Sequence, residues 1–129
     1  MKQLFLAIAL IALPVALFSG YEFYGANTAQ AAAAGLGDLS NFKLIITDVA
    51  ALAGKGDMPG AARRITDFET AWDQAETAIR PLDQAGWGNI DMAADGALKA
   101  VRSPSPQPDK VKAALATLLA ELNDPSKAP

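Results

Sequence analysis

Four segments of the chain repeat apolar residues at spacings of three and four, the period of one face of an α-helix. No stretch alternates apolar and polar residues with a period of two, so the pattern predicts an all-α chain. The repeating positions are Phe42, Ile45, Val49 and Leu52; then Ile65, Phe68, Trp72, Ala75 and Ile79; then Trp87, Ile90, Ala94, Ala97 and Val101, with Leu98 beside them; and finally Val111, Leu115, Leu118 and Leu122, with Leu119 beside them.

Residues that favour helix ends separate these segments. Side chains suited to cap a helix N-terminus precede each one, at Asp38 or Ser40, Asp57, Asp83 and Asp109. Glycine or proline follows each one, at 54–56, Pro81, 103–108 and Pro125. Because the connections are short, we expect successive helices to be antiparallel, in an up-down four-helix bundle over residues 38–124.

Small side chains predict which helices pack most closely. In the heptad register of the second segment, Ala71 and Ala78 occupy g positions, and in the third segment Gly86, Ala93 and Ala100 do. In an antiparallel pair these positions face each other. We therefore expect the second and third helices to make the tightest contact in the bundle.

The N-terminal 31 residues have the three parts of a secretory signal peptide. A cationic start at 1–3 precedes an apolar run over 4–18, and Ala29-Gln30-Ala31 matches a cleavage pattern. As a helix the run would rise about 22 Å, short of the roughly 30 Å hydrocarbon core of a bilayer. We expect removal of 1–31 and a periplasmic location for the remainder, with a linker at 32–37 and a tail at 125–129.

A retained membrane anchor is the alternative for this segment. The aromatic residues of 21–24 fit an interfacial belt, and 4–24 is just long enough to span a bilayer if uncleaved. Lys2 would then hold the N-terminus inside, so the bundle would again face the periplasm. Contact with a membrane is expected only through this segment.

The composition excludes several classes of chemistry. The 129 residues include no histidine and no cysteine, so Ser-His-Asp or Cys-His catalysis and thiolate or imidazole zinc sites are ruled out. The formal net charge is −3 with scattered basic residues, which disfavours nucleic acid as a partner because phosphate binding requires clustered Lys and Arg. We expect neither a catalytic residue nor a cofactor.

Carboxylates give the only candidate metal ligands. Glu69, Asp73 and Glu76 share one face of the second helix, and Asp91 and Asp95 are one turn apart on the third. Oxygen ligands suit a hard cation. The other interpretation is a solvated acidic face, which the predicted close contact of the helices favours because it would turn both clusters outward.

Trp87 is the candidate interaction residue. Like Trp72 it falls on the apolar stripe, so packing in the core is one interpretation. The other is an aromatic side chain at one end of a groove, with its indole N–H as a polar group for a partner. The glycines on either side of Trp87 favour it over Trp72 for that role.

A resemblance adds to this interpretation over residues 40–122. It is found at 56–65, Phe68-Glu69, Trp72-Asp73, Glu76, Trp87, Ile90-Asp91, Ala94-Asp95, Ala97-Leu98 and Arg102. In these residues the chain resembles small exported helical-bundle proteins and, more distantly, the extracytoplasmic helical domains of bacterial iron permeases. The R-E-x-x-E motif of such permeases is absent, so the resemblance implies a helical bundle but assigns no iron ligand.

The sequence thus predicts a non-enzymatic interaction or accessory protein at the periplasmic face, with a protein partner. One alternative is a cation-binding helper in iron or calcium handling that uses Glu69, Asp73 and Glu76. Another is an accessory subunit of a membrane complex, anchored by 4–24.

Overall fold

Four α-helices follow one another in the computed structural model, which describes residues 35–125. They are α2 (Ser40–Gly54), α3 (Met58–Ile79), α4 (Gln84–Val101) and α5 (Pro108–Asn123), and the 3₁₀ turn η2 (Arg80–Leu82) joins α3 to α4. This part of the chain contains no strand, so the predicted all-α class with four helices is confirmed. The predicted signal peptide or anchor lies outside the described residues.

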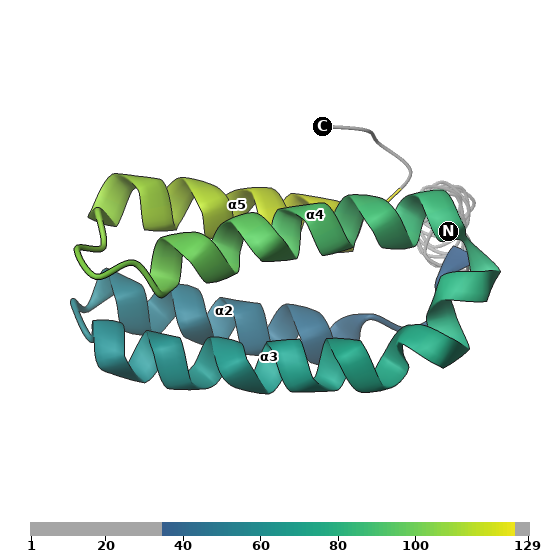
Figure 1. Ribbon diagram of the computed structural model, residues 1–129, viewed down its shortest axis with the longest axis horizontal. Coiled ribbons are helices and arrows are strands. Elements are labelled where there is room, and N and C mark those ends of the chain that lie inside the picture. Colours follow the sequence, from purple (N-terminus) through teal and green to yellow (C-terminus); the bar gives the residue numbers. More distant parts are fainter. Residues whose placement is uncertain (1–34, 126–129) are drawn as a thin grey trace, which may run out of the picture. The chain divides into compact units, whose positions relative to one another are not determined.

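Each helix runs antiparallel to the next, as Figure 1 shows. Helix α2 packs against both α3 and α5, and α4 packs extensively against α5. The described residues all belong to one compact unit.

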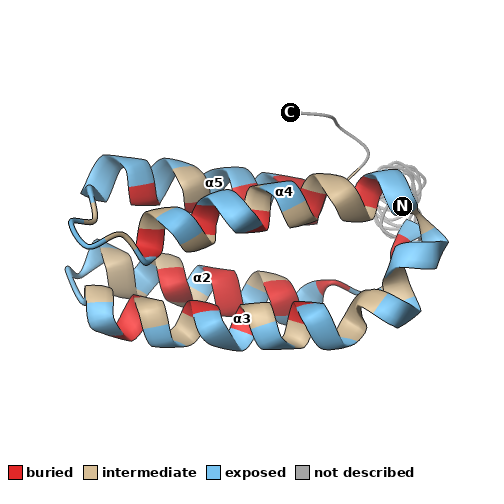
Figure 2. Ribbon diagram, viewed as in Figure 1, coloured by how far each residue is buried: buried red, intermediate tan, exposed pale blue. Residues whose placement is uncertain are grey.

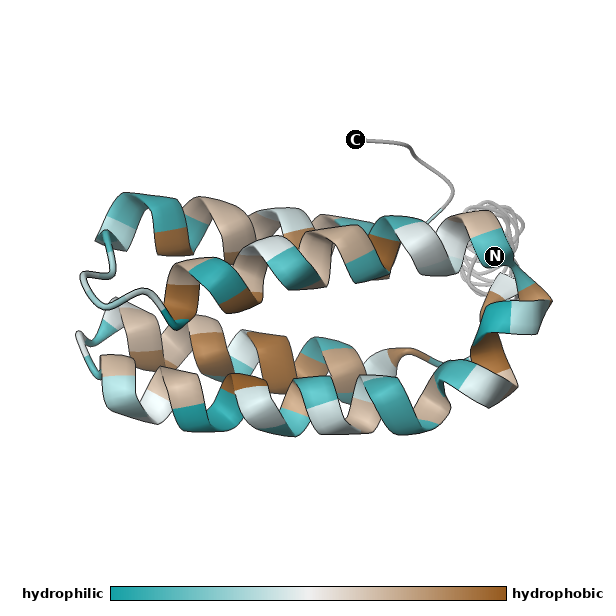
Figure 3. Cartoon of the chain, in the orientation of Figure 1, coloured by the Kyte–Doolittle hydropathy of each residue, from teal (hydrophilic) through white to brown (hydrophobic). Residues whose placement is uncertain are grey.

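The inward faces of the four helices form one apolar core (Figures 2 and 3). The predicted stripes supply most of it, although Leu52, Ala75, Ile79 and Trp87 are only partly buried. Leu36 lies in the segment predicted to be a linker, yet its side chain is buried in this core. The buried apolar residues are Leu36, Leu39, Phe42, Ile45, Ile46, Val49, Ala61, Ile65, Phe68, Trp72, Ile90, Ala94, Ala97, Val101, Val111, Leu115, Leu118 and Leu122.

Helices α3 and α4 begin with the same local arrangement. The side chain of Asp57 accepts a hydrogen bond from Gly60 N at 2.9 Å, and Asp83 accepts one from Gly86 N at 3.0 Å. A Cβ atom on either glycine would overlap the capping carboxylate. The Asp-x-x-Gly sequence therefore defines both helix starts, and both predicted caps are confirmed.

The start of α2 differs in detail from the prediction. Leu39 is the residue before the helix, so neither Asp38 nor Ser40 occupies the capping position. Asp38 Oδ1 accepts a hydrogen bond from Ser40 N at 2.9 Å, which satisfies the N–H of the first helical residue. Hydrogen bonds from the hydroxyl and the backbone N–H of Ser40 lower the pKa of Asp38.

The start of α5 also differs from the prediction. Gln107 is the residue before the helix and Pro108 is the first helical residue, so Asp109 lies in the first turn instead of capping it. Proline suits this position because the first helical N–H has no intrahelical acceptor. The carboxylate of Asp109 in the first turn interacts favourably with the positive end of the helix dipole.

The predicted close contact between the second and third helices is wrong. These helices are α3 and α4, and their contact is the least extensive of the four neighbouring pairs. Two large side chains, Trp72 and Trp87, stack between them with ring centroids 5.8 Å apart. With α4 packed in this way, Ala93 and Ala100 line the α4–α5 side of the helix.

Candidate functional site

Two of the three carboxylates proposed as metal ligands on α3 are engaged by arginines. Glu69 forms an ion pair with Arg102, and Glu76 Oε1 lies 2.9 Å from Arg80 Nη1. Asp73, between them in the sequence, is exposed. Within residues 35–125 no three His, Cys, Asp or Glu side chains are grouped closely enough to hold a metal ion. The metal-binding role stays a prediction.

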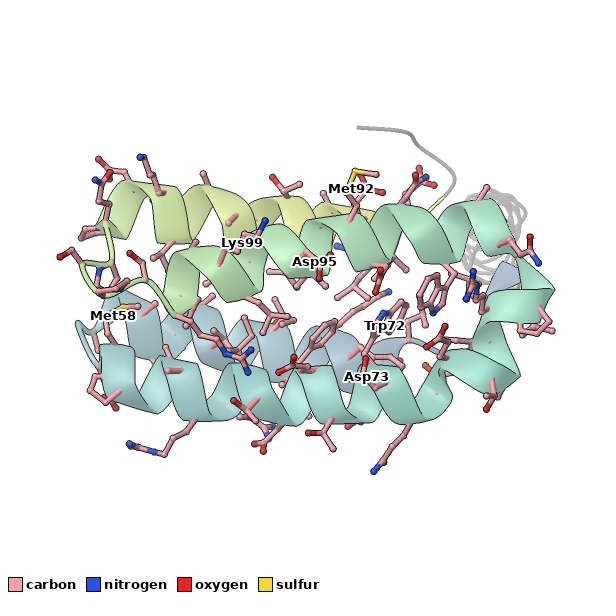
Figure 4. The ribbon with its side chains drawn as sticks, viewed as in Figure 1. Met58, Trp72, Asp73, Met92, Asp95 and Lys99 are labelled. Carbon is pink, nitrogen blue, oxygen red and sulfur yellow. The ribbon has the colours of Figure 1, made fainter. Side chains whose placement is uncertain are left out.

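The acidic residues of α4 do face α3. Trp72 Nε1 donates a hydrogen bond to Asp91 Oδ1 at 3.2 Å, and Trp72 lies between the two helices (Figure 4). Desolvation raises the pKa of Asp91, and repulsion from Asp95, Glu76 and Asp73 raises it further, against the opposing effect of the Trp72 hydrogen bond. The α3–α4 interface therefore concentrates negative charge around one indole N–H.

Trp87 belongs to an aromatic cluster. Its ring is stacked on Trp72, whose ring is in turn stacked on Phe68 at 6.0 Å, and the guanidinium of Arg80 lies 5.0 Å from the Trp87 centroid. The indole Nε1 of Trp87 is buried and has no hydrogen-bond partner. Packing against the core is thus established for Trp87, and its interaction role stays a prediction.

A groove between α4 and α5 is a feature that the sequence pattern does not predict. It has a volume of about 310 Å³. From α4 it is lined by Asn89, Met92, Ala93 and Gly96, and from α5 by Ala114, Thr117 and Glu121. Met92 projects outward from α4 and is 67% exposed (Figure 4). Small side chains at the middle of the interface leave the space open.

Glu121 is the one buried charged residue among those described. Its side chain lines the groove, the residue is only 6% exposed, and its Oε2 atom has no hydrogen-bond partner. A buried carboxylate is strongly destabilising unless a cation or hydrogen-bond donors compensate it. Nearly all buried polar groups in proteins have such a partner. The Oε2 atom of Glu121 is an exception, an unsatisfied acceptor at the groove wall.

The other polar groups of the groove are already engaged. Asn89 Nδ2 donates to Pro125 O at 3.0 Å, which ties the end of α5 to α4. Thr117 Oγ1 donates to Ala113 O at 3.0 Å within α5. Among the side chains that line the groove, Glu121 is therefore the one with a buried polar atom that has no hydrogen-bond partner.

Gly96 keeps the groove open at a cost in helix stability. It lies inside α4, where glycine destabilises a helix by about 1 kcal/mol relative to alanine. A Cβ atom at this position would have no atom within 4 Å, so packing does not require glycine here. The effect of a side chain at Gly96 would be to fill the groove.

A weak signal for this groove exists in the sequence. Glu121 interrupts the leucine-rich run 118–122, and it lies one and two helical turns after Thr117 and Ala114. A lone carboxylate on the small-residue flank of an apolar stripe indicates partial burial. The residues of α4 that lie opposite Glu121 depend on how the two helices pack, which the sequence pattern of α5 alone does not give.

Comparison with protein families, with curated proteins and with solved structures finds no match to this chain. Among the helices of residues 35–125, none combines the length and apolar character that crossing a membrane requires.

Proposed function

We propose that this chain is a non-enzymatic binding module, an exported interaction or accessory protein that takes up a cationic group of its partner in the α4–α5 groove. The observation that supports this most directly is the buried, unpartnered Oε2 of Glu121 at the wall of an apolar groove. An ammonium group is the natural complement, because it supplies both positive charge and hydrogen-bond donors.

The groove suits recognition better than catalysis. Ligand sites are mostly apolar, with few polar groups that fix orientation, and here Glu121 is that group. A lone carboxylate without a paired acid or base offers no general acid–base mechanism of the usual two-carboxylate kind. Binding energy would come from the apolar wall and specificity from the charge.

A periplasmic location is the second part of the proposal. It rests on the order of the cationic start, the apolar run and the cleavage pattern in 1–31. The groove would lie on the periplasmic side of the membrane whether residues 1–31 are removed or residues 4–24 are retained as an anchor.

Hexylammonium is a suitable first probe, with hexanoate as the anion of equal chain length. We expect hexylammonium to raise the melting temperature of the full chain in a saturable manner, and hexanoate to have no such effect. Glu121→Gln should abolish the response, whereas Asp73→Asn, which neutralises an exposed carboxylate on α3, should retain it. Equal responses in the two variants, or no response of the native chain, would overturn the proposal.

A further inference from the structure

A second hollow continues the groove toward the loop between α4 and α5. Its volume is about 330 Å³, and Gly96 lines both spaces. Its polar lining consists of Lys99, Ser103, Ser105, Gln107 and Lys110. The two hollows are therefore consecutive sections of one groove that follows the α4–α5 interface.

The two ends of this groove have opposite charge. Glu121 lies at one end, and Lys99 and Lys110 lie at the other. Neither lysine forms an ion pair with any described residue, although Asp95 is one helical turn before Lys99. Both ammonium groups are thus available to an anion.

The section between the charged ends is formed by small side chains. Ala93, Gly96, Ala100 and Ala114 line it. A surface of this kind accepts an extended main chain without selecting particular side chains. It therefore favours a ligand that is recognised by its ends.

The length of the groove sets the length of the ligand. Helices rise about 1.5 Å per residue, so Lys110 and Glu121 are about 16 Å apart along α5. An extended peptide spans about 3.3–3.6 Å per residue, so about five residues cover this distance. A pentapeptide with free termini also has the required charges, an ammonium at one end and a carboxylate at the other.

The geometry points to an extended peptide of about five residues as the ligand, with its N-terminal ammonium at Glu121 and its C-terminal carboxylate at Lys99 and Lys110. This inference rests on the proposed function, because it assigns the chemical class of the molecule that the groove takes up. It adds the second, cationic end of the site and the length of the ligand.

Three forms of penta-alanine test the inference by titration calorimetry of the full chain. The form with two free termini should bind most tightly. Amidation of the C-terminus should weaken binding about fivefold, the effect of losing a solvent-exposed ion pair of about 1 kcal/mol. Acetylation of the N-terminus should abolish binding, because it leaves Glu121 without a cation.

Variants assign each end. The double variant Lys99→Gln/Lys110→Gln should bind the free and amidated peptides equally, whereas Lys112→Gln, an exposed lysine on α5 outside both hollows, should keep the fivefold difference. Equal binding of the free and amidated peptides by the native chain would overturn the assignment of the cationic end and leave the proposed function intact. Binding of hexylammonium without binding of any peptide would overturn the peptide as ligand. Failure of all probes would overturn both.

Discussion

Trp72 and Asp91 are joined across the α3–α4 interface by a hydrogen bond of 3.2 Å from the indole Nε1 to the carboxylate Oδ1. The same carboxylate is partly desolvated and lies near Asp95, Glu76 and Asp73, which raises its pKa above the ordinary value. The interface therefore combines a favourable hydrogen bond with an unfavourable accumulation of negative charge.

Asp91→Asn should stabilise the protein at neutral pH by a few tenths of a kcal/mol, after allowance for solvent screening. The amide oxygen can still accept from Trp72, but the charge is removed. Because the pKa of Asp91 is raised in the folded state, the wild-type carboxylate destabilises the fold only once it ionises. The advantage of the variant should thus be full above the folded-state pKa and disappear below about pH 3.8.

Urea unfolding between pH 3 and 7 measures this difference. Asp95→Asn removes one of the charges that raise the pKa of Asp91 and leaves the Trp72 hydrogen bond in place, so it should stabilise the protein in the same direction but by less. A loss of stability in Asp91→Asn at pH 7 would contradict the prediction.

The Asp-x-x-Gly starts of α3 and α4 predict a specific coupling. Asp57→Ala should destabilise the protein by about 1 kcal/mol, because the Gly60 N–H loses its acceptor. Gly60→Ala should also destabilise the native chain, because its Cβ would overlap the Asp57 carboxylate. In the Asp57→Ala background the same Gly60→Ala change should be neutral or stabilising. A double-mutant cycle measures the coupling, and strict additivity would contradict the predicted overlap.

Two aliphatic residues of α2 differ in burial, so their replacement by alanine should change the stability of the protein by very different amounts. Ile46 is fully buried, so Ile46→Ala should destabilise by about 2–5 kcal/mol. Leu44 is 58% exposed, so Leu44→Ala should change stability by no more than about 0.5 kcal/mol. Denaturant midpoints of the two variants measure the difference. Similar losses in both would contradict the orientation of α2.

Different substitutions at Gly96 should change either the stability of the protein or its binding of a ligand. Gly96→Ala and Gly88→Ala should each stabilise the protein by up to about 1 kcal/mol, because both glycines lie within α4 and a Cβ atom on either would meet open space. Gly96→Leu should fill the groove and abolish hexylammonium binding. Ala116→Leu, on the exposed face of α5 outside the groove, should leave binding unchanged. Retained binding in Gly96→Leu would contradict the location of the site.

Processing of the N-terminus gives a prediction for the full chain. Intact mass spectrometry of periplasmic and membrane fractions should find a soluble species that starts near Ala32. A membrane-bound species that retains Met1 would contradict cleavage and would support the anchored form.

The sequence predicts the helices of this protein well because most boundaries depend on local chemistry. Asp57 and Asp83 cap their helices through contacts with residues only three positions away, and the apolar stripes follow from the helical period. The rotation of α4 is a different kind of property. It depends on contacts between helices, such as the stacking of Trp87 on Trp72, which a heptad register does not contain.

That rotation also explains why the sequence does not predict the candidate site. The heptad register places the small residues Ala93 and Ala100 toward α3, whereas they line a groove with α5. Glu121 on α5 lines a groove only because those small residues of α4 lie across the interface from α5. Its burial is a property of the helix pair and not of either segment alone.

The central claim, that the α4–α5 groove is the binding site, is tested most directly by mapping hexylammonium on the full chain with amide chemical shifts. We expect saturable shifts at Ala93, Gly96, Thr117 and Glu121, with no comparable changes at Asp73 and Glu76 on α3. Shifts concentrated on the acidic face of α3, or no saturable shift in the groove, would contradict the claim.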